Sequence, residues 1–91
     1  MSATALRKRL TRSLLKEINE VQFPSVTMMD RVEAALGSED DFEAYVEVLV
    51  KKVEETQYPS ISLLNRLDGL LAQLESLERQ HQEASQDRQA A

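Results

Sequence analysis

The chain has 91 residues, with 16 acidic and 11 basic side chains, two prolines, two glycines and no cysteine. This length corresponds to a single domain, and the lack of cysteine excludes disulfides and the usual cysteine-based zinc sites. The apolar runs are too short to cross a membrane, and the basic N-terminus lacks the continuous apolar core of a signal peptide. We therefore expect a cytoplasmic protein.

An internal repeat with an offset of 35 residues is the main feature of the sequence. It is clearest where residues 22–32, QFPSVTMMDRV, return as residues 57–67, QYPSISLLNRL. Every difference between these two segments keeps the chemical character of the side chain, and a weaker match extends the repeat to residues 10–36 and 45–71. A repeat near this length is typical of a small helical unit that buries its apolar face against a copy of itself.

The first expected helix spans residues 4–22. Its apolar residues recur at steps of three and four, which places them on one face: Leu6, Leu10, Leu14, Ile18 and Val21. Pro24 ends this helix, because its ring removes a backbone donor and disfavours the helical conformation at Phe23. The apolar face predicts that the helix belongs to the bundle and is not a free arm.

A shorter second helix is expected before Gly37, which should close it in the left-handed conformation. Ser25 and Thr27 compete for its N-cap. Ser60 and Ser62 compete in the same way at the corresponding place in the second copy of the repeat.

The third expected helix begins after Ser38, with acids in its first turns and lysines near its end, which suits the helix dipole. Its predicted buried face consists of Phe42, Tyr45, Val46, Leu49 and Val53. The fourth helix carries a heptad seam of leucines, namely Leu63, Leu67, Leu70, Leu74 and Leu77. The chain then turns polar, and we expect a flexible polar tail over residues 85–91.

These elements predict an all-α fold, a four-helix bundle made of two tandem, pseudo-symmetric helical hairpins within one domain of residues 1–84. The hairpins are expected to pack about a pseudo-two-fold axis. Alternatively, two subunits complete one bundle as a homodimer, through exposed parts of the helix at residues 63–77. His81 extends that seam and could make pairing pH-sensitive, although a solvated position on the tail is favoured.

Catalytic, cofactor-binding and metal-binding residues are not recognisable in the sequence. The lone histidine lies in the polar tail, so serine nucleophiles lack a base. Two glycines cannot build a phosphate loop, and the acidic residues fall on predicted solvated faces. We therefore expect a protein that is not an enzyme and uses no cofactor.

The basic first helix is the strongest functional hint, because all acidic side chains of the chain follow residue 16. Its cations are Arg7, Lys8, Arg9, Arg12 and Lys16. They crowd the helix half where the dipole disfavours positive charge. Either the acidic body compensates them, or they bind an acidic protein, RNA, DNA or a membrane surface; the sequence does not favour one over the other.

Two recurring residue pairs are further candidates for partner binding. Phe23 and Tyr58 could present aromatic anchors, but we favour rings that cover the end of the bundle, since internal packing explains their recurrence. Arg31 and Arg66 could bind a ligand together. We favour a structural role, because the stem of Arg66 can cover the leucine seam while its head reaches a carbonyl or a carboxylate.

The sequence thus predicts a small acidic protein that binds another protein through helix-face contacts, as an adaptor, inhibitor or immunity-type factor. The alternative is a nucleic-acid-binding accessory regulator. It would use the basic first helix or a helix-turn-helix-like hairpin of residues 43–57 and 60–77. The exposed side of that second helix is close to neutral or acidic, which counts against the hairpin.

The stretch Leu63-Leu64-Asn65-Arg66-Leu67 resembles a segment of the helical immunity proteins that protect bacteria from small peptide bacteriocins. Those proteins are also small four-helix bundles. The resemblance covers residues 47–71, and it implies a non-enzymatic binding role. The internal repeat is not part of it.

Overall fold

The computed structural model describes the backbone of residues 2–90 and the side chains of residues 2–82. Within this part the chain forms four helices and no strand: α1 (Ala3–Glu20), α2 (Val26–Ala35), α3 (Glu39–Glu55) and α4 (Ile61–Ala90). The predicted all-α class is therefore confirmed. The backbone of α4 continues to Ala90. The predicted flexibility of residues 85–91 stays a prediction, because their side chains and all of residue 91 lie outside the described part.

Each helix begins at a serine whose hydroxyl oxygen accepts a hydrogen bond from the backbone N–H three residues later. The donor–acceptor distances are 3.1 Å at Ser2, Ser25 and Ser38 and 3.0 Å at Ser60. This geometry satisfies one of the orphan donors at a helix N-terminus. The competition for the caps of α2 and α4 is thereby decided for Ser25 and Ser60.

The helices end differently from the prediction. Gly37 was expected in the left-handed conformation, but no residue of the described chain has a positive φ. Instead α2 ends at Ala35, and the next residue, Leu36, has an extended conformation with φ −68° and ψ 120°. Val21 after α1 and Thr56 after α3 are extended as well. The last carbonyls of these helices therefore need donors other than those of a left-handed cap.

Side chains from neighbouring turns and helices supply those donors. The Thr11 hydroxyl lies 2.9 Å from the Arg7 carbonyl and 3.1 Å from the Ala35 carbonyl at the end of α2. The Lys52 ammonium of α3 donates to the carbonyl of Asn19 at 3.1 Å and to that of Val21. Thr11 and Lys52 are 2% and 7% exposed. Their polar groups can be buried because they form hydrogen bonds with carbonyls at helix ends.

The predicted apolar faces are confirmed in their central parts. The buried apolar residues are Ile18, Met29, Val32, Tyr45, Val46, Leu49, Leu67, Leu70 and Leu74. The expectation for the start of α1 is wrong, because Leu6 and Leu10 are 49% and 57% exposed. Residues 2–10 are all exposed, so the first turns of α1 extend beyond the core.

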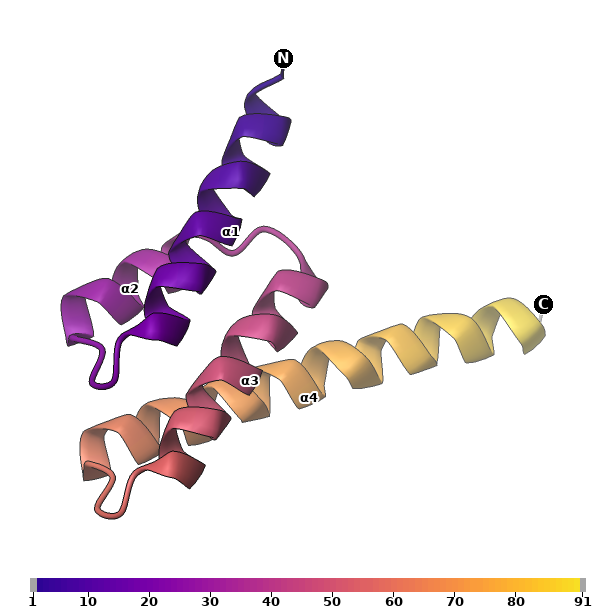
Figure 1. The fold of residues 1–91 in the computed structure, drawn as a ribbon. Coiled ribbons are helices and arrows are strands. Elements are labelled where there is room, and N and C mark those ends of the chain that lie inside the picture. The colour runs from indigo at the N-terminus through magenta and orange to yellow at the C-terminus, as the bar shows by residue number, and fades with distance from the viewer. Residues whose placement is uncertain (1, 91) are drawn as a thin grey trace.

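The four helices form two hairpins, which we call the first unit (α1 and α2) and the second unit (α3 and α4). Within each unit the two helices pack together, and α1 also packs against α3. Figure 1 shows that both turns lie at the same end of the molecule and that α1 and α3 run in the same direction. The Cα extents of 49 × 37 × 17 Å correspond to two helix layers.

The two units do not pack about a two-fold axis, which corrects the predicted symmetry. A two-fold axis would repeat every contact with the roles of the units exchanged. Arg66 pairs with Glu33, but among the described side chains the exchanged pair, Arg31 with Asp68, is not formed. The units are therefore stacked in the same orientation. The face of the second unit that carries Tyr45 and Arg66 packs against the face of the first unit that carries Glu33.

Lys52 provides a test of the helix-end contacts. We expect Lys52→Met to lower the free energy of unfolding by about 1–3 kcal/mol, because it leaves the partly buried Asn19 and Val21 carbonyls without this donor. Lys51→Met is the matched control; Lys51 is exposed, so its loss should change the free energy by less than about 0.5 kcal/mol. Urea unfolding followed by circular dichroism measures both, and equal effects would contradict the assigned role.

Candidate functional site at the paired turns

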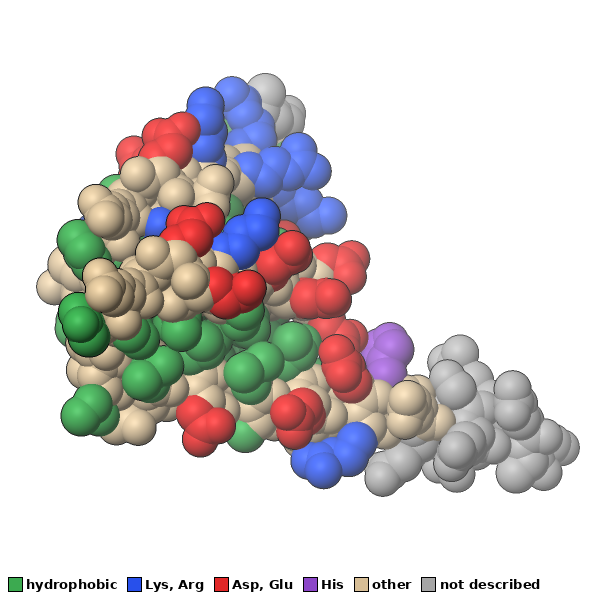
Figure 2. Space-filling view, turned by 60° about the horizontal axis from the view of Figure 1, so that its bottom comes forward, with side chains coloured by type: hydrophobic (Ala, Val, Ile, Leu, Met, Phe, Trp, Pro, Cys, Tyr) green, Lys and Arg blue, Asp and Glu red, His purple; other side chains and the backbone are tan. Residues whose placement is uncertain are grey.

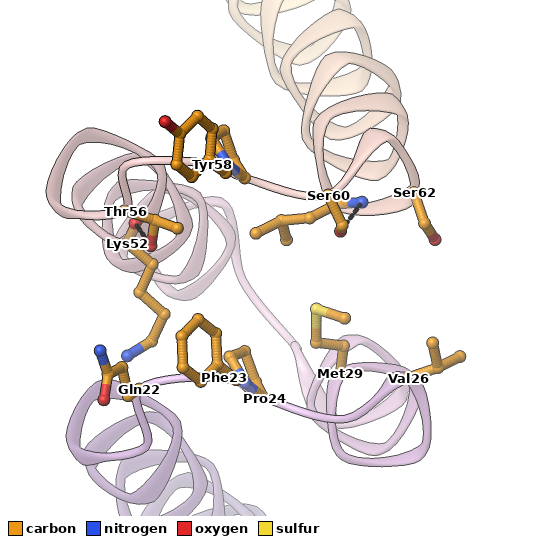
Figure 3. A pocket seen from close by; sticks show the side chains of 12 residues that line it. Gln22, Phe23, Pro24, Val26, Met29, Lys52, Thr56, Tyr58, Ser60 and Ser62 are labelled. Atoms are coloured by element: carbon orange, nitrogen blue, oxygen red, sulfur yellow. Dashed lines mark hydrogen bonds between the residues drawn. The ribbon is translucent and has the colours of Figure 1, made fainter.

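The two turns of the repeat lie side by side and enclose a cavity of about 320 Å³. Figure 3 shows Phe23, Pro24 and Met29 on one side of this cavity and Tyr58 and Ser60 on the other. Its lining consists of Gln22, Phe23, Pro24, Val26, Met29, Lys52, Thr56, Tyr58, Pro59, Ser60, Ser62 and Leu63. The repeat thus contributes the same aromatic, proline and turn positions twice to one site.

The local sequence explains why the aromatic rings project outward. In each turn the aromatic residue stands between an extended helix end and a proline that precedes the serine cap of the next helix. The structure does not place these rings over the end of the bundle, as was expected, since Phe23 is 70% and Tyr58 85% exposed. An exposed apolar residue also opens each following helix, Val26 in α2 and Ile61 in α4.

We call the exposed apolar residues that line the cavity, Phe23, Val26 and Tyr58, the apolar rim. Lys52 is the only charged residue in the cavity lining, and its ammonium is already engaged with the Asn19 and Val21 carbonyls. Ser60 accepts the N-cap hydrogen bond, and the Thr56 hydroxyl donates to the Lys52 carbonyl at 2.6 Å. The site therefore offers apolar contact area with a few polar groups, which suits an apolar side chain of a partner.

Arg66 lies away from this cavity, in a polar cluster that joins three helices. Its guanidinium binds Glu33 at 2.5 Å and Asp30 at 2.9 Å, both on α2. The Tyr45 hydroxyl of α3 donates to the same Glu33 oxygen, Oε2, at 2.6 Å. Arg31, the counterpart of Arg66 in the first unit, is exposed instead, so the structure does not bring the two arginines together as one ligand site.

The environment of this cluster shifts the pKa of its donors. Burial raises the pKa of the Tyr45 hydroxyl far above its ordinary value, and the hydrogen bond to Glu33 raises it further. The hydrogen bond to Glu33 also raises the pKa of Arg66. Both groups therefore remain donors to one carboxylate. The sequence placed Tyr45 in the core, but the role of Glu33 was not predicted. The pattern that could have indicated it is the spacing of Asp30 and Glu33, which puts two acids one turn apart on the same face of α2.

The predicted basic residues are all exposed along α1: Arg7, Lys8, Arg9, Arg12 and Lys16. Figure 2 shows basic side chains gathered near the N-terminal end, next to a band of acidic side chains. Arg7 and Lys8 share a hollow of about 130 Å³ with Asp41 in the acidic first turn of α3. The cations thus lie near the acidic body and away from the apolar rim.

Other predicted features contribute no site. The His81 side chain is 83% exposed, and its Nδ1 lies 3.9 Å from the Glu39 carboxylate. In the part of the chain that the structure describes, no group of three or more His, Asp or Glu residues could hold a metal ion. Over the same residues, every helix is too short or too polar to cross a membrane.

Comparisons with known proteins give no family assignment. The chain matches no protein-family model, and no match is found among curated proteins or among solved structures.

The raised pKa of Tyr45 predicts a pH dependence of stability. A group with a higher pKa in the folded state stabilises the fold fully when the pH is below its unfolded pKa. This contribution is lost progressively as the pH rises from the unfolded pKa toward the folded pKa. We expect the free energy of unfolding to fall as pH rises above about 10, the ordinary pKa of tyrosine. In Tyr45→Phe this fall should be smaller. Urea unfolding between pH 7 and 11 compares the two proteins, with Tyr58→Phe as control; identical pH profiles for Tyr45→Phe and the parent would refute the assignment.

Proposed function

We propose that this chain is a small acidic, non-enzymatic module that binds another protein, and that the apolar rim is its main contact surface. The observation that supports this proposal is the exposure of two aromatic rings, Phe23 at 70% and Tyr58 at 85%, beside a cavity of about 320 Å³. We also expect a cytoplasmic location.

The tandem arrangement supports the proposal, because it places two copies of one aromatic turn at the same end of the molecule (Figure 1). We infer that residues 1–84 form one bundle of two hairpins that holds both turns at a fixed separation. Aromatic residues next to a preformed pocket are typical anchors of protein interfaces. Exposed apolar residues that cluster at one end also carry a cost in water that a bound partner would remove.

The chemistry of the site favours an apolar partner segment. The cavity lining contains a single charged side chain, Lys52, whose ammonium donates to two backbone carbonyls. A cationic partner group would lose its hydration there without finding a counter-ion. An apolar side chain entering between Phe23 and Tyr58 would lose no such interaction, and the rim would then exclude water around it.

The test is a pull-down from the native host lysate with the Phe23→Ser, Tyr58→Ser double variant. We expect at least a roughly tenfold loss of the bound protein, because both anchors are removed. The melting temperature should stay unchanged, because both side chains are mainly exposed. Leu77→Ser is the matched control, since Leu77 is also partly exposed at 38% but lies outside the rim. A double variant that captures the same protein in the same amount would contradict the proposal.

The alternative function, an accessory nucleic-acid-binding regulator, draws on the exposed cations of α1 and the uncovered Leu6 and Leu10. The helix-turn-helix-like hairpin gains no support. Arg66, the basic residue near the start of its second helix, is engaged with Glu33 and Asp30.

The alternative makes a distinct prediction. Nucleic-acid binding through phosphates should weaken steeply between about 50 and 200 mM salt. Changing Arg7, Lys8, Arg9 and Arg12 together to glutamine should reduce that salt dependence and the affinity. Fluorescence anisotropy with a labelled duplex and a labelled single strand measures both. Binding of neither probe at low salt would exclude this function, whereas loss of all captured material after nuclease treatment of the lysate would favour it.

A further inference from the structure

The contact between the two units brings together two surfaces that recur elsewhere on the chain because of the repeat. In this contact the second unit presents a front that contains Tyr45, Leu49 and Arg66. The first unit presents a back that contains Asp30 and Glu33, which accept hydrogen bonds from Arg66 and, at Glu33, from Tyr45. The contact is heterologous, because front and back are different surfaces.

The front of the first unit is open. The equivalent positions in the first copy of the repeat lie 35 residues earlier. Tyr45, Leu49, Arg66 and Leu70 correspond in this way to Leu10, Leu14, Arg31 and Ala35. These four residues line a single surface hollow of about 240 Å³, together with Arg7 and Ala34. Tyr45 is fully buried but Leu10 is 57% exposed, so the same face is covered in one unit and uncovered in the other. We call this hollow the open front.

The back of the second unit is open as well. Met29, Asp30 and Glu33 of the first unit correspond to Leu64, Asn65 and Asp68 of the second unit, 35 residues later. Met29 is 5% exposed, whereas Leu64 is 40% exposed, and both Asn65 and Asp68 are exposed. We call Leu64, Asn65 and Asp68 the open back. It keeps an apolar residue, and it keeps a carboxylate and a second side-chain oxygen at the two positions that hold Arg66 inside the chain.

We propose that copies of this chain associate head to tail, with the open front of one copy against the open back of the next. Arg31 then binds Asp68 and Asn65 of the neighbouring copy, as Arg66 binds Glu33 and Asp30 within the chain. The charges are complementary, because the open front carries Arg7 and Arg31 while the open back carries Asp68. The surface used is separate from the apolar rim, so this inference does not depend on the proposed function.

Several substitutions make the contact between copies weaker than the contact within the chain. Asn65 lacks the charge of Asp30, and Asp68 has a shorter side chain than Glu33. Leu10 lacks the hydroxyl with which Tyr45 binds Glu33. Glu17 stands at the position of Lys52, and it cannot donate to the carbonyls at the end of a neighbouring α3. The association is therefore reversible and depends on concentration. Because the contact is heterologous and leaves one front and one back unused, it gives a series of oligomers and does not stop at a dimer.

Charge reversal tests the proposal on the full chain by analytical ultracentrifugation over a wide concentration range. The parent protein should show a weight-average mass that rises with concentration. Arg31→Glu and Asp68→Lys should each raise the dissociation constant at least about tenfold, because each opposes two like charges. The double variant restores an opposite-charge pair between copies, so its association should return toward that of the parent.

Lys16→Glu and Glu75→Lys are matched controls with the same changes of net charge at exposed positions outside both open surfaces. They should leave the association unchanged, and circular dichroism should show the same helix content in all variants. A protein that stays monomeric at every concentration overturns the proposal. So does a double variant that stays dissociated, or a control that weakens association as much as Arg31→Glu.

Discussion

A single carboxylate, that of Glu33, connects three of the four helices. It accepts hydrogen bonds from Tyr45 of α3 and Arg66 of α4 while it stands on α2. Both donors belong to the second unit and the acceptor belongs to the first, so the relative position of the two units depends on this group. Its side chain is 27% exposed, and removal would leave a buried hydroxyl without its acceptor. Together with the apolar core that both units share, this contact holds the two units in their stacked position.

The helix ends add a second constraint of the same kind. The carbonyls at the end of α1 are served by Lys52, which reaches them from the other unit. The end of α2 is served by Thr11 of α1. A helix that ends in a left-handed glycine terminates by itself, whereas these helices need a neighbour to complete their hydrogen bonding. Secondary and tertiary structure are therefore coupled at the points where the chain changes direction.

Periodicity and turn chemistry predicted the four helices, both proline breaks and the buried centre of the leucine seam. The same patterns did not predict which apolar helix faces are buried, because burial depends on whether another helix covers the face. Leu10 and Tyr45 occupy equivalent positions in two similar copies, yet one is exposed and the other fully buried. Local sequence indicates which side of a helix is apolar, but only the stacking of the units decides whether that side is covered. Phe23 and Tyr58 were therefore identified as candidates but wrongly expected to cover the end of the bundle.

The exposed start of α1 has a consequence for the dynamics of the chain. All described residues from 2 to 10 are exposed, and the first buried side chain is Thr11. Opening these turns would uncover no packed core, so local unfolding there costs far less than global unfolding. The cations near the positive end of the helix dipole lower that cost further. The most basic segment of the protein is thus also the one whose helix can be lost and rebuilt while the two stacked units stay intact.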